Sequence, residues 1–450
     1  MARLGVSMRK MKDSGLQWIG QIPEEWVAGR MKDVIGLLTD YTANGSFGDL
    51  AKNVQYLDDG FARLVRLTDL RENLTNANGI FIDEPTFNYL AKSKLKGGDI
   101  LVANVGAYSG LFCEMPKVEY PCSLAPNMFL IRTNKRMIQH FLFYVGSSNF
   151  VWEQLVQKAV SSAQPKLNKT DIKTTFLPIP PLAEQQKIAD FLDEKCGEID
   201  SIRSDVQREI EILNDYKKSV ITEAVTKGLN PKTKLKDSGI EWIGKIPEGW
   251  GVKRFKYIAD ALYKGNGITK EQVFLDGNTQ CVRYGEIYSK YNISFSDCLS
   301  LTKCELISSP QYFEYGDILF AGTGELVEEI GKNIVYLGNE KCLAGGDIVV
   351  ARHSQNPSFL NYALGSSYCQ SQKSSGKAKL KVVHISATQI GNILVAVPPL
   401  PEQKAIADYL DEKCSEIDAT IADKQKQLET LDEYKKSLIF EYVTGKKECV

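Results

Sequence analysis

Two loops rich in lysine, hydroxyl and amide side chains have the composition of a surface that contacts nucleic acid. The first loop reads SSAQPKLNK over residues 161–169, and the second reads QKSSGKAKLK from Gln372. Lysine and arginine contribute a salt-sensitive attraction to phosphates, and glutamine, asparagine and arginine can bond to base edges in the major groove. The candidate contact residues in these loops are Lys166, Asn168, Lys169, Lys373, Lys377, Lys379 and Lys381.

The charge distribution favours this interpretation, although the formal net charge of the chain is only −1. Residues 348–401 contain no carboxylate, and they include Arg352 together with the lysines of the second loop. Residues 120–170 contain one carboxylate, Glu153, and they include Arg132. A chain that is neutral as a whole can therefore carry two basic faces. We add Arg132 and Arg352 to the candidate DNA-binding residues.

Two further arginines occupy matching positions, in the dipeptides Val65-Arg66 and Val282-Arg283. Each of them precedes a segment that mixes apolar and acidic residues. Two interpretations of Arg66 and Arg283 stay open at this point: a contact with DNA, or an ion pair within the fold.

The chain contains two copies of one unit. Residues 12–26 read KDSGLQWIGQIPEEW and residues 236–250 read KDSGIEWIGKIPEGW, with 11 of 15 positions identical. Residues 181–200 and 399–418 share 15 of 20 positions in the pattern PLxEQxxIADxLDEKCxEID. The segments between these motifs have diverged much further. Two repeats of about 220 residues are too few and too long for a solenoid, so the pattern indicates a constant scaffold that carries two different binding segments.

Each copy ends in a long predicted helix with an apolar heptad stripe. A Pro-Pro pair precedes each helix, and Gly228 marks the end of the first one. Lys424 interrupts the second stripe at the position where Val206 stands in the first. A stripe this narrow cannot be buried alone, so we expect the helices, each of about 45 residues, to pair with each other. The predicted seam residues are Leu192, Ile199, Val206, Leu213 and Val220, with Leu410, Ile417, Leu431 and Leu438.

The segments between the motifs have the short apolar runs of mixed α/β domains. The predicted strands cover residues 63–67, 99–105, 127–132 and 174–179, and in the second copy 280–284, 317–321, 347–352 and 393–397. The predicted helices cover residues 137–147, 150–160 and 357–370. Both copies contain the sequence GDIL before a loop with two glycines. Those glycines suit either a close approach to a phosphate or a simple tight turn.

Motifs for catalysis are missing from the sequence. Both Pro-Pro pairs are followed by leucine, so the Asn/Asp-Pro-Pro-aromatic motif of an adenine methyltransferase is absent, and no GxxxxGK[ST] phosphate loop occurs. The two copies of Asp-Glu-Lys have the letters of a nuclease site, but they fall on the predicted helices. With three histidines and no CxxC pair, the chain has little from which to build a metal site.

The duplicated motif KDSGxxWIGxIPExW, the block PLxEQxxIADxLDEK and the GDIL element resemble those of the specificity subunits of Type I restriction-modification systems. The resemblance covers essentially all 450 residues. It implies an α/β fold class: two similar mixed α/β target-recognition domains separated by two long antiparallel coiled-coil helices, with an internal pseudo-two-fold repeat. The implied domain bounds are 1–16 for an N-terminal leader, 17–180 for target-recognition domain 1, 181–228 for a central conserved helix, 229–240 for a linker, 241–398 for target-recognition domain 2 and 399–450 for a C-terminal conserved helix.

The resemblance also implies a function without catalysis in this chain. Each domain would read one half of a bipartite, asymmetric site on double-stranded DNA, and the paired helices would fix the gap between the half-sites. The helices would bind two modification (methyltransferase) subunits, and restriction/translocase subunits would join the complex. S-adenosylmethionine, ATP and Mg would belong to those partners, so no cofactor and no metal site is expected in this chain.

One alternative remains open, a coiled-coil adaptor that binds proteins without DNA sequence specificity. The acidic outer faces of the helices fit either a solvated surface or a docking surface for another protein. No apolar run approaches the roughly 20 residues that span a bilayer, and the basic N-terminus lacks an apolar signal core. We therefore expect a cytoplasmic protein that does not contact a membrane.

Overall fold

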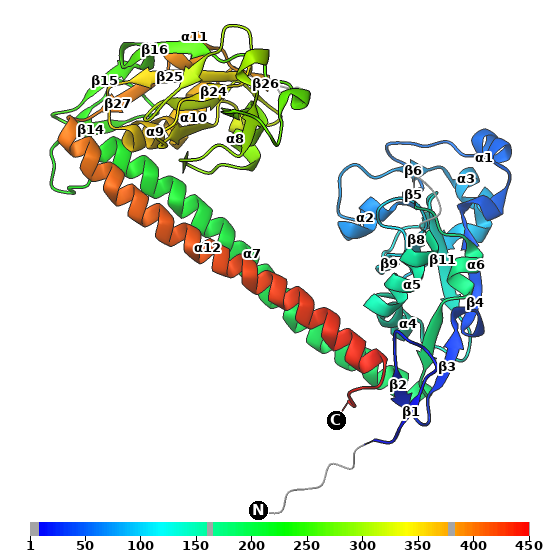
Figure 1. Ribbon diagram of the computed structural model, residues 1–450. Helices are drawn as coiled ribbons and strands as arrows, with labels where there is room; N and C mark the ends of the chain where they lie inside the picture. The colour runs from blue at the N-terminus through cyan, green and yellow to red at the C-terminus, as the bar shows by residue number, and fades with distance from the viewer. Residues whose placement is uncertain (1–8, 160–164, 377–382, 450) are drawn as a thin grey trace, which may run out of the picture. The chain divides into compact units, whose positions relative to one another are not determined.

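The computed structural model describes residues 9–159, 165–376 and 383–449, which fall into two compact units. Unit 1 comprises the residues up to 206 together with those from 427 onward, and unit 2 comprises residues 207–426. Each unit contains one mixed α/β domain and a part of each long helix, α7 (Leu182–Lys227) and α12 (Leu400–Val443) (Figure 1). These elements confirm the predicted fold class.

The two long helices have about the length that the heptad stripes predict. Helix α7 has 46 residues and α12 has 44. Both start immediately after a Pro-Pro pair and carry a glutamate, Glu184 or Glu402, in the first turn, where a negative charge is favourable. Helix α7 ends before Gly228, whose φ of +74° stops the helix at no steric cost because glycine lacks Cβ.

The domain of unit 1 is built on two four-stranded sheets. One sheet has the order β4-β11-β8-β9 and is antiparallel throughout, and the other has the order β6-β5-β10-β7. The GDIL sequence enters β8, a fully buried strand in the interior of its sheet. The strands are β1 (Met11–Asp13), β2 (Gln21–Pro23), β3 (Val27–Arg30), β4 (Ile35–Asp40), β5 (Ala62–Val65), β6 (Phe81–Ile82), β7 (Lys94–Leu95), β8 (Ile100–Ala103), β9 (Phe112–Glu114), β10 (Cys122–Leu124), β11 (Met128–Thr133) and β12 (Phe176–Ile179).

The domain of unit 2 repeats this plan with one more strand in its larger sheet. Its larger sheet has the order β16-β25-β21-β23-β18 and its smaller sheet the order β19-β17-β24-β20. The strands are β13 (Leu235–Asp237), β14 (Lys245–Pro247), β15 (Gly251–Arg254), β16 (Ala259–Lys264), β17 (Thr279–Val282), β18 (Ser294–Phe295), β19 (Ser300–Thr302), β20 (Tyr312–Phe313), β21 (Ile318–Ala321), β22 (Thr323–Gly324), β23 (Asn333–Tyr336), β24 (Cys342–Ala344), β25 (Ile348–His353), β26 (Val383–His384) and β27 (Leu394–Val397).

Short helices cover the sheets and complete the loops of both domains. In unit 1 they are α1 (Phe47–Asn53), α2 (Leu67–Arg71), α3 (Glu84–Tyr89), α4 (Gln139–Gly146), α5 (Asn149–Ala159) and α6 (Lys169–Lys173). In unit 2 they are α8 (Tyr284–Ser289), α9 (Pro357–Gly365), α10 (Ser367–Ser374) and α11 (Ala387–Gly391).

One predicted helix is wrong. The apolar period predicts a single helix over residues 357–370, but the chain forms α9 and α10 with a break at Ser366, which has an extended backbone (φ −66°, ψ 159°). The Ser366 hydroxyl donates to the carbonyl oxygen of Ala363 at 2.6 Å, and this local bond competes with helix continuation. Unit 1 has the same arrangement between α4 and α5, where Ser148 donates to Val145.

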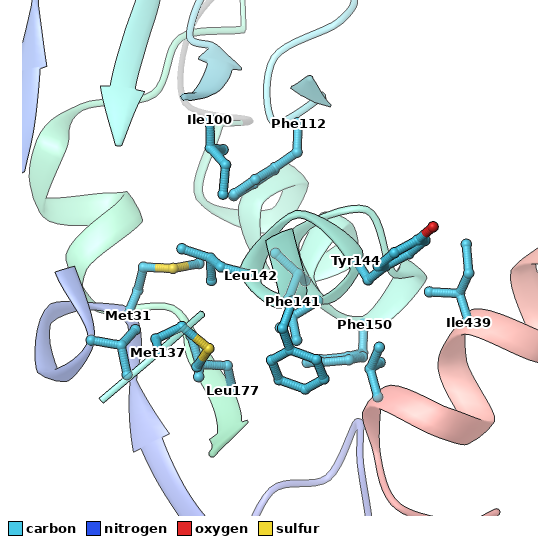
Figure 2. Packing of buried hydrophobic residues seen from close by; sticks show 14 of the residues in the cluster. Met31, Ile100, Phe112, Met137, Phe141, Leu142, Tyr144, Phe150, Leu177 and Ile439 are labelled. Carbon is cyan, nitrogen blue, oxygen red and sulfur yellow. The ribbon is translucent and has the colours of Figure 1, made fainter. Parts of the chain in front are cut away.

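The main core of unit 1 joins the larger sheet, α4 and α12. Figure 2 shows Phe141 and Leu142 of α4 among side chains that come from the strands, including Ile100 of β8 and Phe112 of β9. Ile439 of α12 belongs to the same cluster. Because burial of apolar surface is the dominant stabilising term in folding, this cluster fixes the domain on the helix part of its own unit.

The duplicated motifs contact each other within each unit. The indole N–H of Trp26 donates to Glu184 Oε2 at 2.7 Å, and that of Trp250 donates to Glu402 Oε2 at 2.9 Å. Both tryptophans are buried, and a buried indole N–H needs an acceptor. The final tryptophan of one motif and the first glutamate of the other thus form a matched pair, which gives a physical reason for repeating both.

Further matched bonds hold each domain on its long helix. Tyr144 donates to Asp193 at 2.6 Å in unit 1, and Tyr362 donates to Asp411 at 2.8 Å in unit 2. Buried Gln185 bonds the backbone before α4, and Gln403 makes the same contact before α9. The PLxEQxxIADxLDEK block is therefore the part of each helix that carries a domain.

The predicted seam residues are all buried or half-buried. Leu192, Ile199, Val206, Leu410, Ile417 and Leu438 are buried, and Leu213, Val220 and Leu431 are half-buried. Ile202 and Tyr216, which the heptad pattern also allows at the seam, are exposed instead. A straight helix drifts relative to a seven-residue repeat, so some apolar residues beside the stripe turn outward.

Ion pairs in each unit show that the helices run antiparallel. In unit 1, Lys435 bonds Asp200 at 2.6 Å, and in unit 2, Lys217 bonds Asp418 at 2.6 Å. Lys424, which interrupts the seam, directs its ammonium group to Glu209. The lysines of these three pairs are half-buried, with 13–29% of their side chains exposed.

His140 links the domain of unit 1 to α7 through two carboxylates. Its Nδ1 lies 2.9 Å from Glu114 Oε2, and its Nε2 lies 2.6 Å from Asp193 Oδ1. The hydrogen bond with Glu114 is the largest influence on the pKa of His140; together with Asp193 it outweighs burial and raises this pKa to about 9. Because the folded pKa lies above the unfolded value of about 6.5, the stabilisation is complete below about pH 6.5 and is lost as the pH rises through about 9.

We therefore expect the free energy of local opening in unit 1 to fall between pH 6.5 and pH 9.5, and His140→Gln to flatten this dependence. The repeat places Ser358 at the matching position of unit 2, which serves as the internal control. Hydrogen exchange of peptides from β9 and α4, measured across this pH range, checks the expectation. An equally steep pH dependence in His140→Gln would contradict it.

Within residues 9–159, 165–376 and 383–449, no helix combines the length and the apolar character that crossing a lipid bilayer requires.

Candidate nucleic-acid interface

A hollow of about 810 Å³ opens in unit 1 beside the first lysine-rich loop. Its wall contains Asn104 after β8, Asn127 before β11 and the loop that leads into α6. Phe47, at the start of α1, also lines it and is 81% exposed. The buried Oδ1 atom of Asn104 has no hydrogen-bond partner among the described residues. A buried acceptor in this state is a place where a bound molecule can supply the donor.

The residues of the first loop that lie among the described residues are held in defined positions. Leu167 is buried, and its backbone N–H bonds the carbonyl oxygen of Asn104 at 2.8 Å. Asn168 caps α6 by accepting from the backbone N–H groups of Thr170 and Asp171 at 2.8 and 3.0 Å. Lys169 pairs with Asp40 at 3.0 Å, whereas Lys166 is exposed on the wall of the hollow.

Arg132 and Arg352 both bind the aspartate of the GDIL sequence in their own unit. Arg132 makes two bonds of 2.7 Å to Asp99, and Arg352 makes bonds of 3.3 and 3.1 Å to Asp317. Each aspartate is buried, so the arginine supplies the charge that its burial requires. We therefore leave both arginines out of the contact surface that we propose below.

Arg66 also forms a bidentate ion pair. Its Nε and Nη2 atoms each lie 2.9 Å from a carboxylate oxygen of Asp69, which is fully buried. Arg63 and Asn76 bond the same carboxylate at 3.2 and 2.6 Å. Burial would raise the pKa of Asp69, but the hydrogen bonds from Arg66 and Asn76 outweigh it and hold this pKa well below its ordinary value.

A second hollow, of about 520 Å³, opens in unit 2. Like the hollow of unit 1, it is lined by the segment after the first strand of the larger sheet and by the turn before the sheet's long antiparallel strand. Its wall contains three cations, Lys270, Arg283 and Lys290, and two carboxylates, Glu286 and Asp347. The two hollows thus share two lining segments of the repeat. The remaining wall is the loop into α6 in unit 1 and α8 in unit 2, so the hollows present different side chains.

Lys373, from the second lysine-rich loop, has an unexpected position. Its side chain is buried, and its ammonium group donates to Asn333 Oδ1 at 2.7 Å. Burial lowers its pKa to about 8. We therefore leave Lys373 out of the proposed contact surface. Lys377, Lys379 and Lys381 lie outside the described residues.

Sequence reasoning missed several residues of the two hollows. Asn104, Asn127 and Phe47 come from three separate segments of unit 1, and Lys270 and Lys290 come from two segments of unit 2. The sequence offered one signal for Asn127, which follows a proline directly before a strand. In the structure this residue has a left-handed φ of +70°. Asparagine tolerates that conformation better than other non-glycine residues.

The chemistry that these hollows offer is noncovalent. Amides, lysines and an arginine can donate to phosphates and to base edges. The described residues contain no group of three or more histidine, cysteine or acidic side chains placed to hold a metal ion.

Comparison with known proteins shows the family of this chain. Residues 23–211 and 247–430 match the family model described as the Type I restriction modification DNA specificity domain. The chain belongs to this family, and it is a specificity subunit with target-recognition domains. Specificity subunits of Type I systems are non-catalytic and act as DNA-recognising members of a larger complex.

Similar proteins align over nearly the whole chain. The Type I restriction enzyme MjaVIII specificity subunit of Methanocaldococcus jannaschii is 26% identical, with 95% of this chain and 94% of the relative covered. The EcoKI specificity subunit of Escherichia coli is 21% identical, with 87% and 83% covered. A solved chain, described in work on complex assembly and conformational transition of the type I R-M system, has a TM-score of 0.68 at 18% identity and covers 95% of this chain and 99% of its own length.

Proposed function

We propose that this subunit reads a bipartite, asymmetric DNA target, with one half-site for each target-recognition domain. The observation that carries the proposal is the pair of hollows, which share two lining segments in the two copies but differ in their other wall and in their side chains. Amides and lysines surround the first hollow, and an arginine with two lysines lies on the second. Two copies of one fold with different contact chemistry suit two different half-sites.

The proposed DNA contacts in unit 1 are Lys166, Asn168 and Lys169, together with Asn104 and Asn127. In unit 2 we propose Lys270, Arg283 and Lys290, and Lys377, Lys379 and Lys381 stay proposals from the sequence. For the domains we propose the bounds 17–180 and 241–398, with the leader 1–16, the linker 229–240 and the helical segments 181–228 and 399–450. The predicted seam residues are proposed as the contact that holds the two helices together.

We further propose that the helices dock two modification subunits and that restriction/translocase subunits complete the complex in the cytoplasm. S-adenosylmethionine, ATP and Mg would be bound by those partners. Exposed apolar residues on the long helices, Ile202, Ile212, Tyr216 and Tyr434, support a docking role because they have no place in the seam. The helix pair would also set the gap between the half-sites.

A salt series on the complex with its modification subunits tests the DNA-reading role. Lys166→Ala is expected to weaken binding to every DNA sequence to a similar extent and to reduce the slope of log K against log salt by about one unit. Lys341→Ala, at an exposed lysine that lines neither the hollow of unit 1 nor that of unit 2, serves as the matched control. An absence of DNA binding at moderate salt would favour the alternative, a coiled-coil adaptor for proteins.

A further inference from the structure

Arg66 and Arg283 hold the same backbone position in the two copies. Each follows the strand that pairs in parallel with its neighbour, β5 or β17, and each directly precedes a short helix. The backbone N–H of Arg66 donates to Asp69 at 2.8 Å, and that of Arg283 donates to Glu286 at 2.9 Å. The local fold is thus the same, so any difference between the two guanidinium groups arises from their surroundings.

The Nε and Nη2 atoms of Arg66 both donate hydrogen bonds within the protein. It makes two bonds of 2.9 Å to Asp69, and its Nη2 atom also donates to the carbonyl oxygen of Asn78 at 2.6 Å. A bidentate pair with a buried carboxylate uses both donors of one edge of the guanidinium group. Arg66 therefore has its specific hydrogen bonds inside the protein.

The guanidinium group of Arg283 is not engaged in this way. Its Nη2 atom lies 3.6 Å from Glu286 Oε1, which is beyond hydrogen-bond distance. That carboxylate oxygen already accepts from Lys290 at 2.9 Å and from Ser300 at 2.5 Å. The Nε atom of Arg283 is buried and has no hydrogen-bond partner among the described residues. A buried donor without an acceptor costs free energy until a ligand or water supplies one.

The surroundings of Arg283 favour a ligand that carries acceptors. Arg283 lines the hollow of unit 2 beside Lys270 and Lys290. Of the two carboxylates there, Glu286 is buried and bonded, and Asp347 pairs with Lys264 at 3.3 Å. Lys270 and Lys290 can attract phosphates, whereas the planar fork of an arginine matches a pair of acceptors. Among base edges in the major groove, guanine presents such a pair in O6 and N7.

We propose that Arg283 is a specificity-determining residue that reads a guanine in the half-site of target-recognition domain 2, and that Arg66 has a structural role only. This inference rests on the proposed function. It assigns different roles to Arg66 and Arg283, which occupy matching positions in the two copies of the sequence.

The test uses the complex with its modification subunits and sequences the methylated sites in DNA. The variants are Arg283→Lys and Arg283→Ala, with Arg66→Lys as the matched control. For both Arg283 variants we expect one guanine position in one half-site to lose about ten- to a hundredfold of its discrimination, while the other half-site is unchanged. The unfolding temperature is expected to fall for Arg66→Lys and to stay unchanged for Arg283→Lys, which keeps the charge and safeguards the fold.

Two results would overturn the inference. Equal loss of methylation at all targets with an unchanged motif would make Arg283 a phosphate contact, and a loss of stability as large as that of Arg66→Lys would make it structural. The proposed function fails separately if the complex that carries no substitution methylates no bipartite target. A bipartite motif that is unchanged in both Arg283 variants would refute this inference alone.

Discussion

Removing one heptad from each long helix, residues 207–213 together with 421–427, is expected to shorten the preferred gap between half-sites by about three base pairs. Seven residues of helix span about 10.5 Å, and a base pair of B-DNA rises about 3.4 Å. The paired deletion removes Glu209 and Lys424 together, so neither charge is left without its partner. It also keeps the heptad phase, because a whole number of repeats is lost from both helices.

Methylation of the original target is expected to fall at least a hundredfold. A shift of three base pairs places one domain on the wrong bases, and each mismatched base pair costs about 1–3 kcal/mol. The motif is read by sequencing methylated DNA from cells that carry the variant complex. Glu211→Gln, at an exposed position within the deleted segment, is the control and should leave the gap unchanged. An unaltered gap after the paired deletion would refute the spacing role of the helices.

Asp69→Ala is expected to destabilise target-recognition domain 1 by about 3–5 kcal/mol, because it leaves a buried charge without a partner. Asp69 is fully buried, and Arg63, one of the two arginines that bond it, is only 5% exposed. Without the carboxylate, Arg63 keeps its bond of 2.6 Å to the carbonyl oxygen of Leu74 but loses its compensating charge. Hydrogen exchange of peptides that contain β5 measures the local free energy of opening.

The same network predicts a loss of stability in acid. The pKa of Asp69 in the folded protein lies well below its ordinary value, so its contribution is complete above the unfolded pKa of about 3.9 and is lost as the pH falls through the folded value. Asp69→Ala should therefore show a weaker acid dependence than the unmodified protein. Asp58→Ala, at an exposed position, is the control, with an expected change of at most about 0.5 kcal/mol. A β5 that opens with unchanged free energy in Asp69→Ala would rule out this role.

Most of the secondary structure followed from the sequence because its signals are local. The heptad stripe predicted two helices of about 45 residues, and α7 ends before the predicted Gly228 because a glycine with positive φ stops a helix. All eight predicted strands exist within a few residues of their expected bounds. The prediction of one helix over residues 357–370 failed because a hydroxyl–backbone bond at Ser366 is invisible to hydrophobic periodicity.

Two lysines have positions in the tertiary structure that their sequence context does not indicate. Lys373 stands in a lysine-rich loop, yet its side chain is buried against Asn333, which lies 40 positions earlier in the chain. Lys424 breaks the apolar stripe, yet it lies at the helix pair because its ammonium group forms an ion pair with Glu209 of the other helix. In both cases the partner comes from a remote segment, so no local pattern could predict the contact.

The sequence by itself determined the duplicated plan, the paired helices and the family, since repeats and heptad periods depend only on the order of residues. Only the tertiary structure decided which basic side chains remain available. Arg66 meets a buried aspartate with both oxygens in reach, whereas the glutamate beside Arg283 is already held by Lys290 and Ser300. The physical reason is that the acceptors available to a guanidinium group are set by side chains from other strands and helices, which folding brings together.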